Sequence, residues 1–154
     1  MREPDFYYRS MNRIYLAGPI MHKEDSAYTW RNDLKEEYQT DELKIVNPLD
    51  TELPDGTPKR EIDNDYDKVY EYRADIVRSD IGTLSMCDGV LVNWEDDVQM
   101  AGTPMELMYA YSNEIETVLV YDGDIKSLSP WLHYYSHEIT DALDEGMNYL
   151  IDHV

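Results

Sequence analysis

Residues 13–19 are Arg13-Ile14-Tyr15-Leu16-Ala17-Gly18-Pro19, a short apolar run that leads directly into a glycine–proline pair. An apolar run of this length, ended by residues that break regular structure, is typical of a buried β-strand. Ligands of α/β folds bind at the carboxyl ends of the strands. Gly18 and Pro19 are therefore expected to lie beside a binding site.

Strands and helices alternate along the rest of the chain. Apolar residues at helical spacing predict an amphipathic helix that is capped by Asp25 or Ser26 and ends near Tyr38. Further strands are predicted at residues 43–47, 88–94 and 117–121, and further helices at 62–84, with room for one break, and at 103–112. Three prolines and one glycine predict a long loop at 48–60.

The last thirty residues carry weaker patterns. They predict a short helix near Trp131, a strand at 133–138 and a final helix from about Thr140 to His153. Strands that are apolar throughout and that alternate with helices indicate a parallel sheet with helices on both of its faces. The predicted fold is therefore an α/β, Rossmann-like single domain at 12–154, preceded by a loose leader at 1–11.

The chain of 154 residues is strongly acidic, with 13 Lys and Arg against 33 Asp and Glu and a formal charge of -20. This charge repels nucleic-acid backbones and anionic membranes, so neither is expected as a partner. The first residues lack the apolar region of a signal peptide, which predicts a cytoplasmic protein. The acidic excess fits either adaptation to a salty cytoplasm or an ordinary acidic protein.

Motifs for common cofactors and metals are missing. The Gly18-Pro19 turn is not G-x-G-x-x-G, and no P-loop occurs, so dinucleotide and nucleoside-triphosphate binding lose their main support. The histidines, including His133 and His137, lack metal-ligand spacing, and Cys87 is the single cysteine. We expect neither a metal nor a cofactor.

Asp80 and Glu106 are the main candidates for chemistry. Asp80 lies on the apolar stripe of its predicted helix, where burial raises a carboxyl pKa and suits the group to proton transfer. The alternative for Asp80 is an ion pair with Arg73 on the same helix face. Glu106 closes a capping box with Thr103, yet its helix also starts at the same crevice as Gly18. Capping and catalysis both remain open for Glu106.

Two other residues have equally open roles. Asp97 belongs to an acidic run that is ordinarily solvated surface, and Tyr15 belongs either to the core or to the site. A pair of buried carboxylates without a metal suits glycosidic bond chemistry, in which one carboxylate attacks the anomeric carbon and a proton donor assists the leaving group.

Three motifs, in this order and spacing, resemble the nucleoside 2-deoxyribosyltransferase family over residues 12–132. They are Tyr15-Leu16-Ala17-Gly18-Pro19, Asp80 followed by Cys87-Asp88-Gly89-Val90-Leu91-Val92, and Gly102-Thr103-Pro104-Met105-Glu106-Leu107. The resemblance implies a flavodoxin-like sheet, a nucleoside or nucleotide and a free nucleobase as substrates, and a homo-oligomer whose subunits share their active sites.

The resemblance also implies roles for single residues. Glu106 matches the family's nucleophile, Asp80 the aspartate that binds the base and helps to protonate it, and Tyr15 the tyrosine that orients the nucleophile. Asp97 is similar to an aspartate that binds a sugar hydroxyl. Substrate contacts are further expected from Gly18, Pro19, Gly102, Thr103 and, from a neighbouring subunit, Ser127.

Ser127 leaves the substrate open. It stands where related deoxynucleoside 5′-monophosphate N-hydrolases contact phosphate, whereas transferases tend to carry Asn there. The predicted function is cleavage of the N-glycosidic bond of a 2′-deoxynucleoside through an intermediate on Glu106, with transfer to a second base. Hydrolysis of a nucleoside 5′-monophosphate is the alternative, and a non-catalytic nucleotide-binding module, in which Glu106 only caps its helix, is the third possibility.

Overall fold

The computed structural model describes residues 11–20, 26–98 and 100–154. Residues 1–10 of the expected leader and the alternative cap Asp25 lie outside these residues. Within the described ranges, none of the helices combines the length and apolar character needed to cross a membrane.

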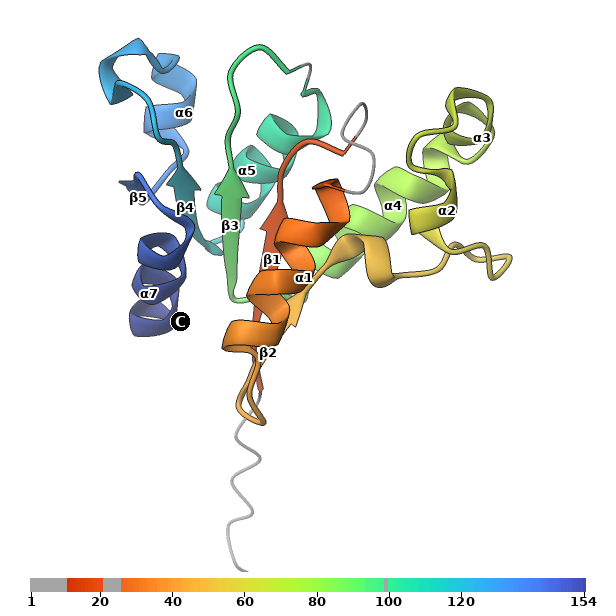
Figure 1. Cartoon of the computed structure of the whole chain (residues 1–154), viewed down its shortest axis with the longest axis horizontal. Coiled ribbons are helices and arrows are strands. Elements are labelled where there is room, and N and C mark those ends of the chain that lie inside the picture. Colours follow the sequence, from red (N-terminus) through yellow and green to blue (C-terminus); the bar gives the residue numbers. More distant parts are fainter. Residues whose placement is uncertain (1–10, 21–25, 99) are drawn as a thin grey trace, which may run out of the picture.

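A single sheet of five parallel strands forms the centre of the fold, in the order β2-β1-β3-β4-β5 (Figure 1). The strands are β1 (Asn12–Ala17), β2 (Leu43–Val46), β3 (Gly89–Asn93), β4 (Glu116–Val120) and β5 (Glu138–Thr140). The first four agree with the predicted strands to within one residue at each end. The parallel α/β fold is thereby confirmed.

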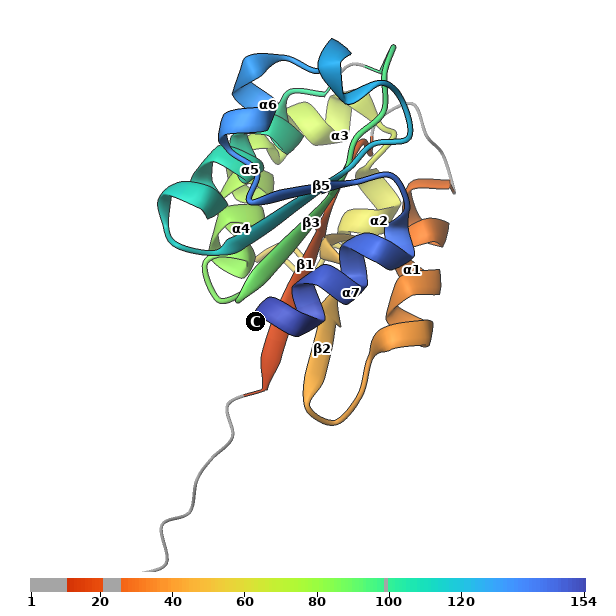
Figure 2. The ribbon, with the colours of Figure 1, turned by 90° about the vertical axis from the view of Figure 1, so that its left-hand side faces the viewer.

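Helices cover both faces of the sheet (Figure 2). The helices α1 (Ser26–Tyr38) and α7 (Leu143–His153) lie on one face, and α4 (Arg73–Leu84) and α5 (Gly102–Ser112) lie on the other. Short segments complete the fold: 3₁₀ turns at Pro48–Asp50 and Ile125–Ser127, and the helices α2 (Lys59–Ile62), α3 (Tyr66–Glu71) and α6 (Pro130–Tyr134).

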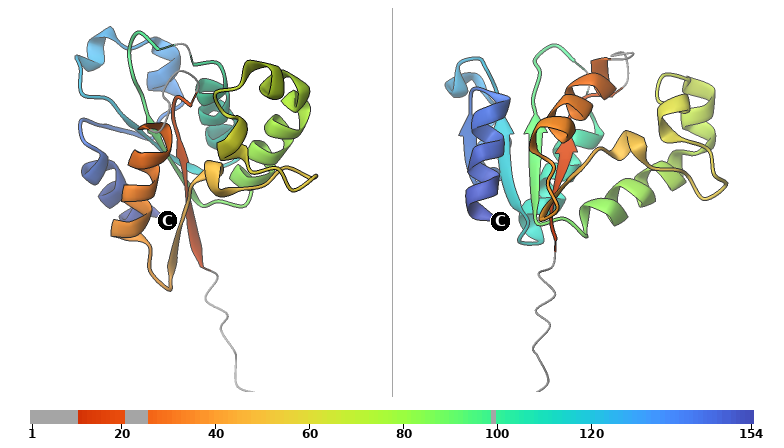
Figure 3. Two further views of the ribbon diagram at one scale, coloured as in Figure 1. Left: turned by 45° about the vertical axis from the view of Figure 1, so that its right-hand side comes forward. Right: turned by 60° about the horizontal axis from the view of Figure 1, so that its bottom comes forward.

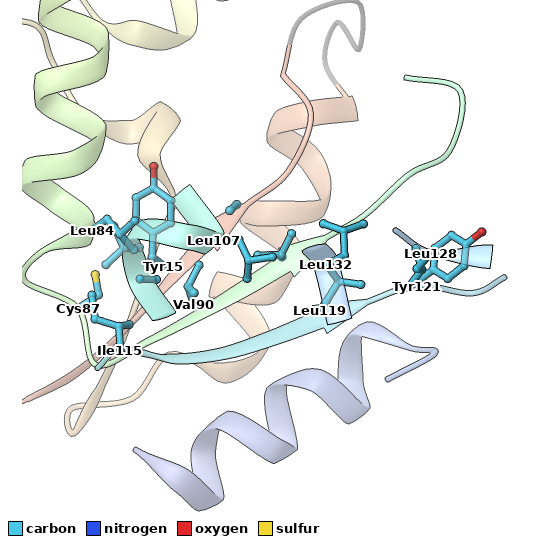
Figure 4. Packing of buried hydrophobic residues seen from close by; sticks show 14 residues of the cluster. Tyr15, Leu84, Cys87, Val90, Leu107, Ile115, Leu119, Tyr121, Leu128 and Leu132 are labelled. Atoms are coloured by element: carbon cyan, nitrogen blue, oxygen red, sulfur yellow. The ribbon is translucent and has the colours of Figure 1, made fainter. Parts of the chain in front are cut away.

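Each face of the sheet has its own apolar core. Leu34 of α1 and Met147 of α7 pack with strand residues on one face. Leu84 of α4, Leu107 of α5 and Tyr15 of β1 pack together on the other (Figure 4). These two cores follow from strands that are apolar on both sides, and they hold α4 and α5 in fixed positions against β1 and β3.

The helix predicted at 62–84, with room for one break, is interrupted twice, because α2 ends at Ile62, α3 covers Tyr66–Glu71 and α4 covers Arg73–Leu84. Asp65 starts α3 by accepting a hydrogen bond from the Lys68 backbone N–H at 3.2 Å, and Tyr72, with φ -95° and ψ 11°, separates α3 from α4. Helical spacing of apolar residues continues across both breaks, so periodicity does not reveal them. The three helices together stand to one side of the sheet (Figure 3).

The C-terminal third also departs from expectation. Residues 133–138 do not form a strand, because Pro130 and the Ser129 hydroxyl, which accepts from the Trp131 N–H, start α6 there instead. The strand follows at 138–140, and the final helix begins at Leu143. The predicted loop at 48–60 ends two residues early, since α2 already includes Lys59 and Arg60.

Candidate active site

A cavity of about 630 Å³ lies beyond the carboxyl end of β1, between the turn that follows this strand, α4 and the start of α5. Six of the predicted site residues line it together: Gly18, Pro19, Asp80, Gly102, Thr103 and Glu106. The rule that α/β proteins bind ligands at the carboxyl ends of their strands therefore locates the cavity correctly. Hydrophobic and aromatic residues, among them Val69 and Tyr66, complete the wall.

Glu106 lies in the first turns of α5, and it does not cap this helix. The capping position is held by Ala101, no side chain among the described residues caps the helix, and Thr103 lies inside the helix. The capping interpretation of Glu106 is therefore wrong. Its carboxylate oxygen Oε2 is buried and has no hydrogen-bond partner among the described residues. A buried carboxylate oxygen that is left free in a cavity is available to a ligand.

The electrostatic surroundings of Glu106 bring its titration close to neutral pH. Burial, followed by the nearby charge of Asp80, raises the pKa of Glu106 to about 7. A hydrogen bond with the Tyr15 hydroxyl and the positive charges of Arg31 and Lys59 oppose this rise. The group is therefore partly ionised near pH 7, in a cavity that shields it from bulk water.

Tyr15 lies both in the apolar core and at the candidate site, the two positions that the sequence left open for it. Its ring is buried in the apolar cluster beside Leu84 (Figure 4), and its hydroxyl shares a hydrogen bond with Glu106. Burial and the neighbouring carboxylates raise the pKa of Tyr15 well above 10. The hydroxyl therefore stays protonated near neutral pH and donates to Glu106.

Asp80 pairs with Lys59, and the expected ion pair with Arg73 is wrong. The ammonium of Lys59 lies 2.5 Å from Asp80 Oδ1. Arg73 instead donates to the carbonyl of Tyr70 and lies over the Tyr70 ring, because it begins α4 next to the break at Tyr72. Burial raises the pKa of Asp80, while the Lys59 charge opposes that rise.

Arg31 is a second buried cation that the sequence analysis missed. Its guanidinium donates to the carbonyls of Ala27, Gly18 and Leu16 at 2.6, 2.9 and 3.2 Å. It thereby ties the turn after β1 to α1, and its charge acts on Glu106. The available signal was spacing, since Arg31 falls on the same helical stripe as Ala27 and Leu34.

Asp97 and Ser127 are not part of this cavity within one chain. Asp97 is exposed in the loop after β3, at a φ of 60°. Ser127 ends a 3₁₀ turn, where its hydroxyl donates to the Asp124 carbonyl at 2.6 Å. In the part of the chain that the structure describes, no three His, Cys, Asp or Glu side chains are grouped as a metal site would require.

The fold and the cavity together define an α/β protein that places two carboxyl groups, Asp80 and Glu106, in a cavity at the carboxyl edge of a parallel sheet. Comparison with known proteins then names the family. The sequence profile of the nucleoside 2-deoxyribosyltransferases matches residues 14–147, and the chain belongs to this family.

Solved structures agree on the fold. A 2-deoxyribosyltransferase from Bacillus psychrosaccharolyticus is 18% identical, with a TM-score of 0.65 over 89% of this chain and 91% of the other. A conserved protein from Enterococcus faecalis V583 is 15% identical, with a TM-score of 0.63 over 94% of this chain and 100% of the other. No curated protein sequence matches the chain.

Proposed function

We propose that the protein cleaves the N-glycosidic bond of a 2′-deoxynucleoside, holds the deoxyribosyl group on Glu106 and transfers it to a second nucleobase. The buried, unpartnered Oε2 of Glu106 carries this proposal, because an oxygen left without a hydrogen bond is free to attack carbon. Membership in the family and the fold of the Bacillus enzyme support it.

In the first half of the reaction, the ionised Glu106 carboxylate forms a bond to C1′ of the sugar. The C1′–N bond breaks, and its electron pair leaves with the base, which takes a proton from the Asp80 carboxyl group. Tyr15 orients Glu106 through its hydrogen bond. In the second half, the nitrogen of another base attacks C1′ and gives its proton to the Asp80 carboxylate, while Glu106 leaves as a carboxylate.

Burial suits both carboxyl groups to these roles. Glu106, with a pKa of about 7, is ionised in a large fraction of molecules at neutral pH. The pKa of Asp80 is raised by burial, which favours its protonated, donating form. Lys59 beside Asp80 stabilises the carboxylate that remains once the proton has left.

One observation favours a second candidate function, the hydrolysis of a deoxynucleoside 5′-monophosphate. Arg73 lines the larger cavity, where its guanidinium could meet a phosphate. The same two carboxylates would act, with water in place of the second base. The third possibility, a non-catalytic module, needed Glu106 as a helix cap, and Glu106 instead lies within the first turns of α5, whose cap position is Ala101.

We further propose that a neighbouring subunit completes the site. Ser127 lies outside the cavity of its own chain, and the exposed side chains of Trp131 and Tyr134 follow it on α6. Large aromatic side chains of this kind are enriched where subunits meet. A homo-oligomer with shared active sites would carry the Ser127 segment to the cavity of the adjacent chain.

The test compares Glu106→Gln with the wild-type enzyme. Purified protein is incubated with a deoxynucleoside and a free base, and separately with deoxynucleoside monophosphates, and the products are separated by chromatography. Because Gln fills the same volume but does not attack carbon, base exchange should fall by roughly 1,000-fold or more, with folding retained.

The matched control is Glu37→Gln, an exposed residue of α1 that should keep full activity. Trapped deoxyribosyl-enzyme, detected by intact-protein mass spectrometry, should appear in the wild type and be absent from Glu106→Gln. If Glu106→Gln retains most of its activity, the nucleophile is another residue. Release of base only from monophosphates would select the hydrolase function.

A further inference from the structure

A second, smaller cavity of about 170 Å³ adjoins the larger one. The two cavities share Ile20, Val69 and Asp80 as lining residues, so Asp80 stands at their junction. The walls of the smaller cavity are almost wholly apolar, and its polar residues are Lys59, Asp63 and Asp80. Nothing in the proposed reaction uses this space or gives Lys59 a direct contact with substrate.

The size and the walls of this cavity suit one flat ring. Dry apolar cavities of about 150 Å³ in proteins bind benzene, so 170 Å³ accommodates a ring of a nucleobase. Ile62 and Ile76 contribute apolar surface for the ring. Because Asp80 borders both cavities, a nucleoside with its sugar near Glu106 can extend its base toward Lys59.

Lys59 has hydrogen-bonding capacity that the protein does not use. Its side chain is only 5% exposed, and its ammonium donates to Asp80 Oδ1. An ammonium has three N–H donors, and no other acceptor among the described residues bonds to it. Buried donors without an acceptor are costly, so the remaining N–H groups favour a ligand that carries an acceptor.

We propose that Lys59 is the base-recognition residue of this site and that it selects bases with a carbonyl oxygen, such as 6-oxopurines, over bases with an amino group at the same position. An ammonium only donates hydrogen bonds, so it binds a carbonyl oxygen and leaves an exocyclic amino group unpaired. The inference rests on the proposed function, because it needs a nucleoside in the cavity.

The same contact assists bond cleavage. When the C1′–N bond breaks, its electron pair enters the base, and the carbonyl oxygen of an oxo base takes up part of the negative charge. The Lys59 ammonium stabilises that charge without giving up a proton, while the proton for the base comes from Asp80. Lys59 thus favours the transition state more than the bound substrate.

The decisive experiment measures kcat/KM for deoxyinosine and deoxyadenosine, whose bases differ at the 6-position and in the proton on N1. The wild type should prefer deoxyinosine by about 10- to 100-fold, the range of one hydrogen bond to a charged group. Lys59→Met, of similar length but without donors, should lose this factor with deoxyinosine in addition to the loss that it shows with deoxyadenosine, because Lys59 also acts on Asp80 and Glu106. Lys35→Met is the control, since Lys35 pairs with Asp50 in an exposed position at 3.0 Å.

Two outcomes overturn the assignment. A wild-type preference for deoxyadenosine contradicts it directly, and an equal loss for both nucleosides in Lys59→Met shows that Lys59 only supports Asp80. Calorimetric binding of free hypoxanthine and adenine to Glu106→Gln tests recognition without turnover. A preference of less than 3-fold for hypoxanthine would reject the Lys59 assignment, even if Lys59→Met fails to fold.

The binding measurement also separates this inference from the proposed function. If the wild type cleaves no deoxynucleoside, the proposed function fails, and the hypoxanthine and adenine affinities still decide whether Lys59 recognises a carbonyl oxygen. If cleavage occurs without discrimination between the two bases, the proposed function stands and the Lys59 assignment fails.

Discussion

The carboxyl group of Glu106 meets two opposing requirements. Its burial removes water that would compete at the sugar, yet burial disfavours the ionised form that attacks. The pKa of about 7 results from both effects, because the hydrogen bond from Tyr15 and the positive charges of Arg31 and Lys59 limit the rise that burial causes. If Glu106 is the nucleophile, stabilisation of its negative charge governs both the rate and the pH at which the enzyme works.

The first prediction concerns the pH dependence of the reaction. Since the proposed reaction needs an ionised Glu106 and a protonated Asp80, kcat/KM should pass through a maximum, and Glu106, with a pKa of about 7, is one of the two groups that set it. Asp80→Asn removes the charge that helps to raise this pKa, so the inflection in its residual activity should move to lower pH. Initial rates between pH 5.5 and about 9 measure both. An inflection that rises in Asp80→Asn would contradict the assignment.

The second prediction concerns stability at the same residue. Burial raises the folded-state pKa of Glu106 from 4.5 to about 7, so the folded protein holds this proton more tightly than the unfolded chain. The resulting stabilisation is complete below pH 4.5 and is lost as pH rises through about 7. Glu106→Gln avoids this loss.

Glu106→Gln should therefore gain stability over the wild type at pH 8, on the order of 3 kcal/mol at most, and much less at pH 5. Urea unfolding at the two pH values measures the difference, with Glu37→Gln as the control. A gain that is the same at both pH values would show that the buried charge is not its cause.

At the scale of elements, the site depends on how α1 is joined to β1. Arg31 of α1 donates to two carbonyls at the end of β1 and in the following turn, and to one in α1 itself. No carboxylate contacts it among the described residues, so its charge is stabilised by these carbonyls and by the carboxylates at a distance. Arg31 is a positioning residue that holds the Gly18 turn against the cavity.

The third prediction follows from these bonds. Arg31→Met should destabilise the protein by about 3 kcal/mol or more, because three buried carbonyls lose a charged donor. It should also shift the inflection of the pH–rate profile upward, since the charge of Arg31 lowers the pKa of Glu106. Arg78→Met, at an exposed position of α4, is the matched control. A variant that loses stability with an unchanged inflection would restrict Arg31 to a structural role.

At the scale of the whole molecule, assembly is the first question. If a neighbour's Ser127 segment completes each cavity, Glu106→Gln and Ser127→Arg should each be inactive. Mixed under conditions of subunit exchange, they should partly restore activity, because some cavities then combine two intact halves. Mixing Glu106→Gln with Glu106→Ala is the control and should restore nothing. Light scattering that finds an active monomer at assay concentration would contradict shared sites.

Net charge is the second property of the whole molecule. A formal charge of -20 on 154 residues destabilises a folded chain through self-repulsion unless salt screens it. If the acidic surface is an adaptation to salt, the unfolding temperature should rise steeply through molar potassium chloride, beyond the roughly 0.1 M that screens ordinary surface charges. A protein with near-zero net charge, measured in the same series, is the control. An unfolding temperature that does not change with potassium chloride would contradict adaptation to salt.

Charge also bears on the choice between the two candidate substrates. A net negative protein disfavours a 5′-phosphate, so a deoxynucleoside should outcompete its monophosphate at low salt. Competition between the two for the same enzyme, followed by chromatography, measures this preference. Preference for the monophosphate would indicate that Arg73, or a basic residue of a neighbour, binds its phosphate.

The sequence by itself determined the first four strands of the sheet, most helices and the position of the cavity. Apolar strands and the Gly18-Pro19 break are local signals, and local patterns are sufficient wherever a strand is buried on both sides. The sequence also singled out Glu106 and Asp80, since each is a carboxylate at a position that its own helix directs toward the crevice.

Tertiary structure alone decided which groups meet these carboxylates. Lys59 and Asp80 are 21 residues apart in the sequence, with two helix breaks between them. Arg31 donates to carbonyls that are 13 and 15 residues away. Neither contact can therefore be recognised from a local sequence pattern. The capping box of Thr103 and Glu106 failed because α5 begins at Gly102, which places Thr103 inside the helix. The start of a helix depends on packing as well as on sequence, and here it leaves the Glu106 carboxylate in the cavity instead of at a helix cap.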